Sequence, residues 1–283
     1  MDSRWKDKVA AITGAGSGIG RALALELAKR GAQVALSDKN EKTLLETAEQ
    51  VRQLHSGTRV TTRALDVADR AAVHAWADEV VREHGHVNFI FNNAGVAVGS
   101  TLEGVSYEDF EWIMNINFWG VVYGTKAFLP HLRASGDGHV INISSIFGIL
   151  AVPGNGAYNA SKFAVRGFTE ALRQELELSG ANVSATCVHP GGVKTNIARD
   201  ARMSKNVGEY LVKDADSARD EFEKMFSTTP ESAAKQILAG VRSNARRVLV
   251  GADARAIDAM VRFLPTTYQK LTVAVIRRRR AMA

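Results

Sequence analysis

The sequence contains a single cysteine, and it has no long uninterrupted run of apolar residues. Because Cys187 has no partner, an internal disulfide is excluded, and we expect a cytoplasmic protein whose thiol is buried and inert rather than nucleophilic. No apolar stretch precedes the first predicted strand as a signal peptide would, and no run is long enough to span a bilayer. These absences predict a soluble protein.

Linkers and repeats are also missing. No Pro-, Ser- or Gly-rich stretch divides the chain, there is no internal repeat, and 283 residues of which 46% are hydrophobic can bury one full core. We therefore expect a single domain over residues 1–283. Within it, residues 191–229 break the regular pattern and are expected to form a substrate lid, and residues 252–283 form a basic C-terminal extension.

Charge of one sign is concentrated at one end of the sequence. The net charge is +6, and Arg277 to Arg280 supply four of these charges, so the rest is nearly neutral. A nucleic-acid binder would need basic residues across one face, and we do not expect one. The arginines follow the apolar segment 268–276, which predicts weak contact with an anionic membrane surface or with a neighbouring subunit. A solvated tail is the alternative.

Short apolar runs alternate with helical patterns along nearly the whole chain. The expected strands are Val9–Thr13, Gln33–Asp38, Val60–Asp66, Val87–Asn92, His139–Ser144, Asn182–His189 and Arg247–Gly251. The expected helices are Gly18–Arg30, Glu41–His55, Arg70–His84, Tyr107–Ser135, Ala157–Ser179 and Pro230–Ser243. This alternation predicts a Rossmann-like α/β fold: a doubly wound, mostly parallel seven-stranded sheet with helices on both faces, in three α/β/α layers.

A glycine-rich loop joins the first predicted strand to the first helix. The segment from Thr13 to Gly20 reads TGAGSGIG, a variant of the G-x-G-x-x-G pattern. A strand that ends in such a loop and continues as a helix points backbone N–H groups at one spot, where a pyrophosphate can bind. Glycines also form ordinary tight turns, but the flanking strand and helix favour a dinucleotide site.

An acidic residue, Asp38, ends the second predicted strand, 18 residues after Gly20. A carboxylate there accepts hydrogen bonds from the adenosine ribose hydroxyls of NAD and repels the extra phosphate of NADP. We therefore expect NAD to be preferred, with NADP possible, because the adjacent Lys39 can neutralise part of the repulsion.

Tyr158 and Lys162 are four residues apart on a predicted helix, so they share one face. A nearby ammonium favours the phenolate, which predicts a tyrosine pKa moved from about 10 toward neutrality. Ser145 ends a predicted strand 13 residues earlier, and the intervening loop can bring both hydroxyls into one pocket. A surface Tyr beside a Lys, and a Ser that caps a turn, are the plainer alternatives.

Together these residues resemble the short-chain dehydrogenase/reductase family. The resemblance covers about Lys8 to Gly251, and it includes further motifs beyond those above. These are Asn92-Asn93-Ala94-Gly95, Asn117 within NINFWG, and Pro190-Gly191-Gly192-Val193-Lys194-Thr195.

The resemblance implies four catalytic residues. Tyr158 is then the general acid/base, and Ser145 hydrogen-bonds the same substrate oxygen. Lys162 lowers the tyrosine pKa and holds the nicotinamide ribose, while Asn117 seats a water in a proton path. Without the family, Asn117 would be an ordinary polar helix position. No metal site is implied.

The resemblance also implies a set of cofactor contacts. They are Gly14, Ser17, Gly18, Ile19, Gly20, Asp38, Asp66, Val67, Asn93, Ala94, Gly95, Tyr158, Lys162, Pro190, Gly191, Val193 and Thr195. NADP-using relatives often carry a basic residue where Ser17 stands, which agrees with NAD. Asp66 as a strand-end cap, and Asn93 as a bridge from sheet to loop, are the alternatives.

The implied activity is hydride transfer between a nicotinamide cofactor and a secondary alcohol or ketone. The expected pocket wall is mostly apolar, which favours a hydrophobic substrate over a polyol, although half of these residues could simply be core. The wall comprises Val96, Val98, Ile146, Phe147, Leu150, Val152, Gly191, Gly192, Met203, Tyr210 and Leu211. The alternatives are an NADP-preferring carbonyl or 3-oxoacyl reductase and a non-catalytic dinucleotide sensor.

Relatives commonly pair two long helices between subunits, here Tyr107–Ser135 and Ala157–Ser179, so we expect a homodimer or homotetramer. The aromatic residues that could supply apolar surface are Trp112, Phe118, Phe128, Phe163 and Phe168. Each could equally face the core.

Overall fold

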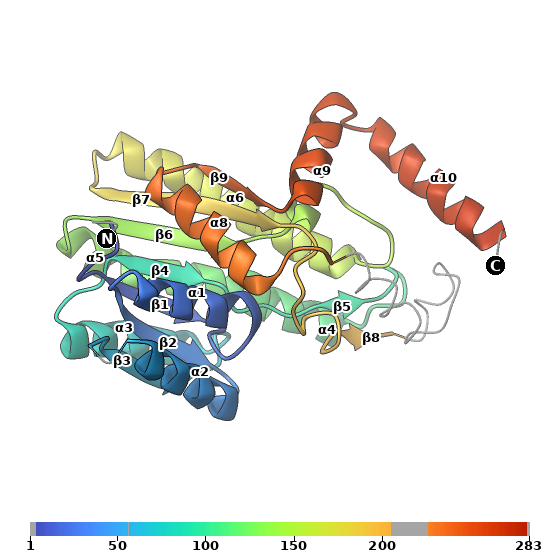
Figure 1. Ribbon diagram of the computed structural model, residues 1–283. Helices are drawn as coiled ribbons and strands as arrows, with labels where there is room; N and C mark the ends of the chain where they lie inside the picture. Colours follow the sequence, from blue (N-terminus) through green and yellow to red (C-terminus); the bar gives the residue numbers. More distant parts are fainter. Residues whose placement is uncertain (1–3, 56, 205–225, 282–283) are drawn as a thin grey trace.

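A seven-stranded, fully parallel sheet forms the centre of the computed structural model, which describes residues 4–55, 57–204 and 226–281 (Figure 1). From edge to edge the strands are β3 (Val60–Ala64), β2 (Gln33–Asp38), β1 (Val9–Thr13), β4 (Phe89–Asn92), β6 (Gly138–Ile143), β7 (Val183–Pro190) and β9 (Arg247–Val250). The chain reverses its direction across the sheet between β1 and β4, and this is where dinucleotides bind in doubly wound folds.

Helices cover both faces of the sheet. One face carries α1 (Gly18–Lys29), α2 (Glu41–Leu54) and α8 (Pro230–Arg242), and the other carries α3 (Arg70–His84), α5 (Gly120–Ala134) and α6 (Gly156–Leu178). The first layer packs around Trp5, Leu23 and Phe89, all fully buried. The second packs around Trp76 and Phe128, whose rings meet edge to face. The predicted three-layer doubly wound fold is confirmed.

The predicted helix Tyr107–Ser135 is interrupted. The chain forms α4 (Tyr107–Met114), then one π-helical segment, η1 (Asn115–Trp119), and then α5. The extra residue of a π-turn rotates the side chains that follow, and such turns are frequent at functional sites. Here it directs Asn117 inward, where its side chain is fully buried.

Phe128 does not supply surface for a partner. It is fully buried against Trp76, so it belongs to the core, whereas Trp119 and Phe163 are 43% and 39% exposed. A side chain's burial depends on which face of α5 meets the sheet, and a helical pattern alone could not decide it for this residue.

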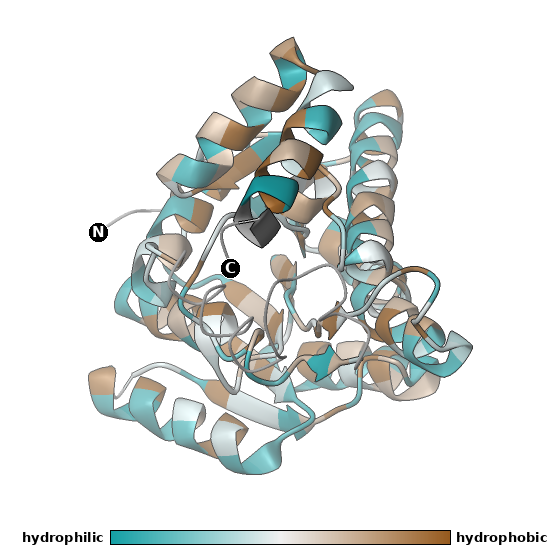
Figure 2. Ribbon diagram, turned by 90° about the vertical axis from the view of Figure 1, so that its right-hand side faces the viewer, coloured by the Kyte–Doolittle hydropathy of each residue, from teal (hydrophilic) through white to brown (hydrophobic). Residues whose placement is uncertain are grey.

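The C-terminal extension is helical. It forms α9 (Ala252–Phe263) and α10 (Thr267–Ala281), and α10 projects away from the body of the molecule (Figure 1). The side of the molecule that holds the C-terminus also shows the carboxyl end of the sheet (Figure 2). Residues 205–225 of the expected lid, including Tyr210 and Leu211, lie outside the described residues. Within the expected lid, residues Arg202–Met203 form β8, which pairs with β5 (Val98–Gly99).

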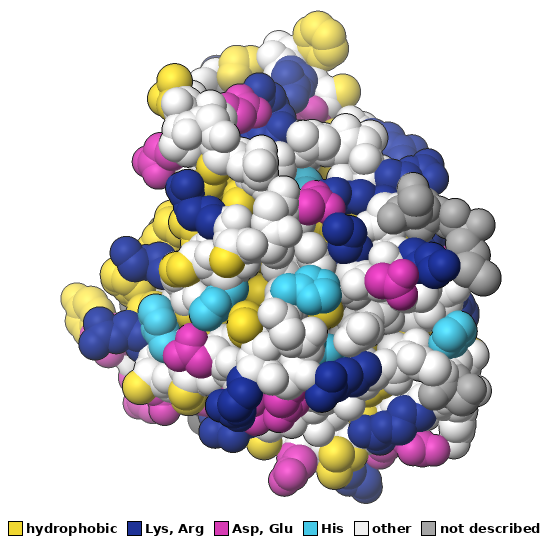
Figure 3. All heavy atoms as spheres, turned by 90° about the vertical axis from the view of Figure 1, so that its left-hand side faces the viewer, with side chains coloured by type: hydrophobic (Ala, Val, Ile, Leu, Met, Phe, Trp, Pro, Cys, Tyr) yellow, Lys and Arg dark blue, Asp and Glu magenta, His cyan; other side chains and the backbone are white. Residues whose placement is uncertain are grey.

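Basic and acidic side chains are interspersed on the face turned away from that side (Figure 3). Within the described residues, no helix is both long and apolar enough to cross a membrane. Cys187 is buried in β7, as expected, and burial raises the pKa of its thiol to about 12.

Three buried histidines are expected to make stability depend on pH. Burial lowers the pKa of His84 and His189 to about 4 and that of His139 to about 3. Between those values and the ordinary 6.5, the unfolded chain binds protons that the folded chain does not, so stability falls as the pH falls. From pH 7 to pH 5 we expect a loss of about 1–2 kcal/mol per histidine, measured by denaturant unfolding.

The control for this expectation is His74→Gln, because His74 is an exposed residue of α3 and its removal should leave the pH slope unchanged. A free energy of unfolding that stays constant from pH 7 to pH 5 would contradict the expectation.

Candidate active site

The glycine-rich loop between β1 and α1 is held against the end of β4. Gly14 has a φ of +64°, and a Cβ built there would lie 2.8 Å from Cα of Ala94. Asn93 donates hydrogen bonds from Nδ2 to the carbonyl oxygens of Thr13 and Gly14, at 2.9 and 3.1 Å. Asn93 therefore bridges sheet and loop, and by doing so it fixes the shape of the loop.

The first turn of α1 packs closely on the glycine-rich loop and lacks a side-chain cap. Gly20 approaches the loop so closely that a Cβ there would lie 2.1 Å from the carbonyl oxygen of Gly14. Ser17 occupies the N-cap position, but its side chain makes no capping hydrogen bond. The N–H groups at a helix start need acceptors, and a phosphate supplies them. Glycine at these positions and an uncapped helix start together fit the pyrophosphate of a dinucleotide.

Asp38 lies beside this loop at the end of β2. Its two carboxylate oxygens accept hydrogen bonds from the N–H groups of Gly16 at 2.9 Å and Asn40 at 2.8 Å. These bonds orient the carboxylate and leave lone pairs for ribose hydroxyls.

Lys39 pairs with Asp66 rather than with Asp38. The distance from Lys39 Nζ to the Asp66 carboxylate is 2.7 Å. Burial opposes ionisation of Asp66, but the hydrogen bonds from Lys39 and from the N–H of Ala68, together with the positive charge of Lys39, outweigh it and lower the pKa of the carboxyl group. Asp66 also accepts from the N–H of Ala68 at 3.0 Å, as a strand-end cap would. Lys39 thus forms its ion pair with Asp66, and no described ion pair joins it to Asp38.

Ser145, Tyr158 and Lys162 come together at the carboxyl ends of β4 and β6. Ser145 follows β6 and hydrogen-bonds the phenol of Tyr158 on α6. The Lys162 ammonium, one turn further along α6, lies 5.6 Å from the centroid of the Tyr158 ring and donates to the carbonyl oxygen of Ile143 at 3.1 Å. The predicted meeting of the two hydroxyls and the ammonium is therefore present.

The pKa of Tyr158 moves in the opposite direction to the one predicted. Burial raises it to about 12, against the opposing effect of the hydrogen bond with Ser145. Burial likewise lowers the pKa of Lys162 to about 8. The ammonium lies over the ring of Tyr158, and in the chain alone desolvation is the largest influence on the pKa of both groups.

Asn117 completes this group from the π-helical segment. Its Oδ1 accepts from the N–H of Val96 at 2.8 Å, and its Nδ2 donates to the carbonyl oxygen of Val96 and to Ser161 Oγ, at 3.0 and 3.1 Å. A Cβ built on Gly95 would lie 3.3 Å from Asn117 Oδ1 and 3.4 Å from Lys162 Nζ. Asn117 and Lys162 therefore flank the same backbone, two residues after the bridge made by Asn93.

The turn after β7 reaches the glycine-rich loop from the other side. A Cβ on Gly18 would lie 2.9 Å from Cγ2 of Thr195, so Thr195 stands directly over the start of α1. Val193 is 5% exposed and pairs with Thr228.

Val67, a predicted cofactor contact, packs against the backbone of Gly120. A Cβ built on Gly120 would lie 2.9 Å from a methyl group of Val67, so Val67 has a packing role in the fold.

Several residues that contact this site carried no recognised sequence signal. Ser161 Oγ links Asn117 to the carbonyl oxygen of Tyr158, and the ring of buried His189 hydrogen-bonds the carbonyl oxygen of Ser145 at 2.9 Å. Asp253 and Tyr268, from α9 and α10, bond the backbones of Gly192 and Ala151. Asp253 and Tyr268 are remote in sequence from the residues they contact, and only the fold brings them to the site.

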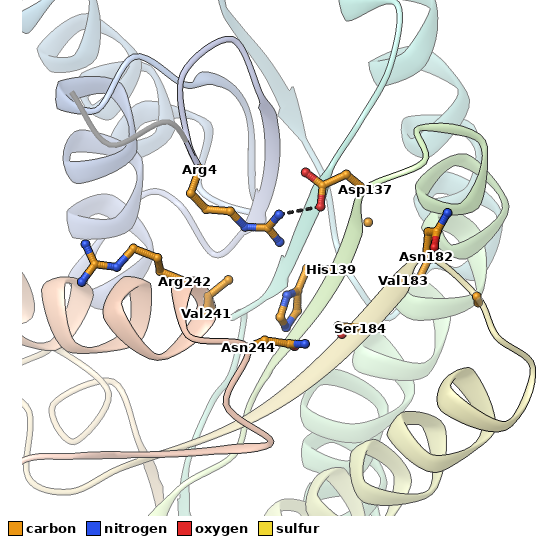
Figure 4. Close-up of a pocket in the computed structure, with 11 residues that line it drawn as sticks. Arg4, Asp137, His139, Asn182, Val183, Ser184, Val241, Arg242 and Asn244 are labelled. Atoms are coloured by element: carbon orange, nitrogen blue, oxygen red, sulfur yellow. Dashed lines mark hydrogen bonds and ion pairs between the residues drawn. The ribbon is translucent and has the colours of Figure 1, made fainter.

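Two cavities lie at opposite ends of the sheet. One of about 440 Å³ has a largely apolar wall and borders the loop before Tyr158; its lining includes Leu102, Val152, Pro153, Tyr268, Thr272 and Val273. The other, of about 310 Å³, lies at the amino ends of β6 and β7, where Arg4, Asp137 and His139 gather (Figure 4). Only the first adjoins the candidate site. The described residues contain no cluster of metal-ligating side chains.

The fold and this site define a dinucleotide-binding α/β oxidoreductase. A family model described as "short chain dehydrogenase" matches residues 8–206, and the chain belongs to this family, as its motifs predicted. It is 50% identical over 273 residues to "Putative oxidoreductase SadH" of Mycobacterium tuberculosis strain H37Rv, covering 96% of each chain. It is 36% identical over 237 residues to retinol dehydrogenase 10-A of Xenopus laevis, covering 74% of this chain and 70% of the relative.

A solved structure supports the binding of a nicotinamide cofactor. The structure of a short chain dehydrogenase/reductase from Burkholderia phymatum in complex with NAD is similar with a TM-score of 0.84. The two chains are 29% identical, and the match covers 94% of this chain and 96% of that one.

Proposed function

We propose that this chain transfers a hydride between NAD and a secondary alcohol or ketone of apolar character. The observation that carries the proposal is the convergence of Ser145, Tyr158, Lys162 and Asn117 beside a loop that fits a pyrophosphate. A dinucleotide sensor needs the loop and Asp38, but it has no chemical need for these four side chains together. The catalytic and cofactor-binding residues inferred from the motifs are part of this proposal.

Each residue of the group has a separate task in the proposal. The bound cofactor supplies the hydride donor or acceptor. Tyr158 gives a proton to the carbonyl oxygen during reduction, and its raised pKa keeps the phenol in the protonated form that this step requires. Ser145 donates a hydrogen bond to the same oxygen and stabilises the charge that develops there. Lys162 holds the nicotinamide ribose, and Asn117 supports a proton path to Lys162.

Cofactor preference follows from Asp38. Its carboxylate is oriented by two backbone N–H groups, and Lys39 is engaged by Asp66, so no described ion pair offsets the charge of Asp38. We propose that NAD is preferred for this reason. A carbonyl or 3-oxoacyl reductase that prefers NADP is the second candidate function, and comparison of initial rates with NADH and NADPH separates the two.

The proposed substrate preference rests on apolar surface around Tyr158. Val98 and Ile113 are buried beside it, Phe147 meets its ring edge to face at 5.9 Å, and the cavity of about 440 Å³ borders the preceding loop. The hydroxyls of a polyol would lose water without gaining partners on such a wall, at a cost of about 1–3 kcal/mol each. Of the nine predicted wall residues that the structure describes, only Val98 and Leu150 are buried in the core, so the preference depends on the half-buried ones nearest Tyr158.

A spectrophotometric screen of alcohols and ketones with NADH, NADPH and their oxidised forms tests the proposed function. We expect turnover with NADH or NAD, and a greater kcat/KM for apolar ketones than for polyols. A panel ranked in the reverse order would contradict the apolar wall as the source of specificity. No turnover with any member, in protein that binds NADH, would favour the sensor instead.

We also propose self-association into a homodimer or homotetramer and a single domain over residues 1–283, with the lid at 191–229. Trp119, the last residue of η1, and Phe163 on α6 are exposed and supply apolar surface for association.

The C-terminal helices suit contact with an anionic membrane surface. The 25 residues after Asp258 contain six of the 36 Lys and Arg residues and none of the 30 Asp and Glu residues, which leaves residues 1–258 with 30 of each and no net charge. On α10, Leu271, Val273 and Val275 are 48%, 41% and 53% exposed. Apolar side chains beside concentrated positive charge match the interface of an anionic bilayer.

Co-sedimentation with liposomes tests this contact. We expect binding to anionic vesicles that weakens with salt and that falls when Arg277 to Arg280 are all replaced by Gln, because each basic residue near the surface contributes about 1 kcal/mol. Equal binding to neutral and anionic vesicles, or binding to neither, would remove the proposal. A change in oligomeric state in the variant would instead indicate a neighbouring subunit.

A further inference from the structure

The carboxylate of Asp253 touches the backbone of the turn that follows β7. Asp253 lies in the first turn of α9, and its Oδ2 accepts a hydrogen bond from the N–H of Gly192 at 2.7 Å. The two residues are 61 positions apart, and Asp253 lies outside the segment 8–206 that the family model matches. The contact therefore joins the C-terminal extension to the motif that contains Gly192, although Asp253 belongs to none of the motifs.

Two glycines leave the space that this carboxylate fills. A Cβ on Gly191 would lie 2.2 Å from Oδ2 of Asp253, and a Cβ on Gly251 would lie 2.4 Å from Oδ1. Gly251 also has a φ of +99°, which side chains rarely adopt. Oδ1 is buried and accepts no hydrogen bond from the described residues. A carboxylate wedged between two backbones in this way leaves the turn little freedom to shift.

The same turn is fixed on its other side by Thr228. The N–H of Thr228 donates to the carbonyl oxygen of Gly192 at 3.1 Å, and the N–H of Lys194 donates to the carbonyl oxygen of Thr228 at 2.9 Å. Held between Thr228 and Asp253, the turn places Thr195 over Gly18 at the start of α1. A shift at Gly192 would therefore move Thr195 relative to the glycine-rich loop.

We propose that Asp253 is a positioning residue for the nicotinamide end of the cofactor site. It acts through the backbone of Gly192, which sets the place of Val193 and Thr195, and it does not touch the reacting atoms. The proposal rests on the proposed function, because that function assigns Val193 and Thr195 to the nicotinamide. Under this proposal the two ends of the site respond differently to the loss of Asp253. The positions of Asp38 and the glycine-rich loop should not change, whereas the position of the turn after β7 should.

Two ligands distinguish this role from a general effect on stability. NADH occupies both ends of the site, whereas ADP-ribose has the adenosine and pyrophosphate but no nicotinamide. We expect Asp253→Ala to weaken NADH binding by about tenfold, the size of one charge-assisted hydrogen bond, and to leave ADP-ribose binding unchanged. Asp253→Asn keeps an acceptor oxygen and should recover most of the NADH affinity. Both are measured by isothermal titration calorimetry.

Matched variants complete the test. Glu231→Ala removes an exposed carboxylate from the first turn of α8 and should change neither affinity. Gly191→Ala places a Cβ against the Asp253 carboxylate and should therefore disturb the same contact and selectively weaken NADH binding. This variant keeps the test available if Asp253→Ala does not fold. An equal loss of both ligands, or no loss of either, would overturn the role of Asp253. Wild-type protein that binds neither ligand would overturn the proposed function together with it.

Discussion

Replacing Tyr158 with Phe is expected to lower kcat by about 10²–10⁴-fold, the usual contribution of a positioned general acid, while NADH binding stays close to wild type. The change removes only the hydroxyl. The Phe ring can keep the edge-to-face contact with Phe147 and the position beneath Lys162 Nζ, so the fold and the cofactor pocket should persist. Steady-state kinetics with the best ketone of the screen, together with NADH titration, measures both effects.

Tyr107→Phe is the matched control, because it removes the same hydroxyl group at a position away from the site. Tyr107 is 90% exposed at the start of α4. This variant should leave kcat and NADH affinity at wild-type values. Turnover that persists unchanged in Tyr158→Phe would overturn the mechanism, whereas a parallel loss of NADH binding would mean that the variant damages the pocket.

The second large effect is expected at Asp38. Asp38→Asn removes the negative charge while preserving size, so the ratio of kcat/KM for NADPH to that for NADH should rise about 10–100-fold. Two changes contribute to this ratio. The 2′-phosphate of NADPH no longer meets a carboxylate, and NADH loses charge-assisted hydrogen bonds to its ribose. Initial rates with both cofactors at fixed ionic strength measure it.

Glu41→Gln controls for a general loss of negative charge, because Glu41 is an exposed carboxylate in the first turn of α2, three residues from Asp38. Its cofactor ratio should match wild type. A ratio that is unchanged in Asp38→Asn, or that changes equally in both variants, would show that Asp38 does not select the cofactor.

Much of the fold could be predicted from local patterns. Apart from the interrupted helix Tyr107–Ser135, the strand and helix boundaries predicted from apolar periodicity agree with the structure to within about two residues, as at Gly18 and Arg70. The glycine-rich loop and the Tyr158–Lys162 spacing are also local, because each lies on one element or one connection. Such features are encoded by neighbours in the sequence. The fold then brings Ser145, Tyr158, Lys162 and Asn117 together from different elements.

The remaining features depend on contacts between distant segments. The π-turn at Asn115–Trp119 accompanies two hydrogen bonds between the Asn117 side chain and the backbone of Val96. The helical periodicity of the sequence does not predict this turn. The pKa of Tyr158 depends on burial, which the four-residue spacing from Lys162 does not reveal. The pairing of Lys39 with Asp66 joins the ends of two neighbouring strands. Asp253 meets Gly192 only because α9 follows β9 back to the carboxyl edge of the sheet.

The most direct test of the account follows a deuterium label from the cofactor to the substrate. In a single turnover with NADH that carries deuterium at both C4 positions of the nicotinamide and an apolar ketone from the screen, we expect deuterium to appear on the carbinol carbon of the alcohol product. We expect the Tyr158→Phe variant to bind the labelled cofactor but to form the product far more slowly. Product without deuterium, or consumption of NADH that does not depend on the Tyr158 hydroxyl, would contradict the account.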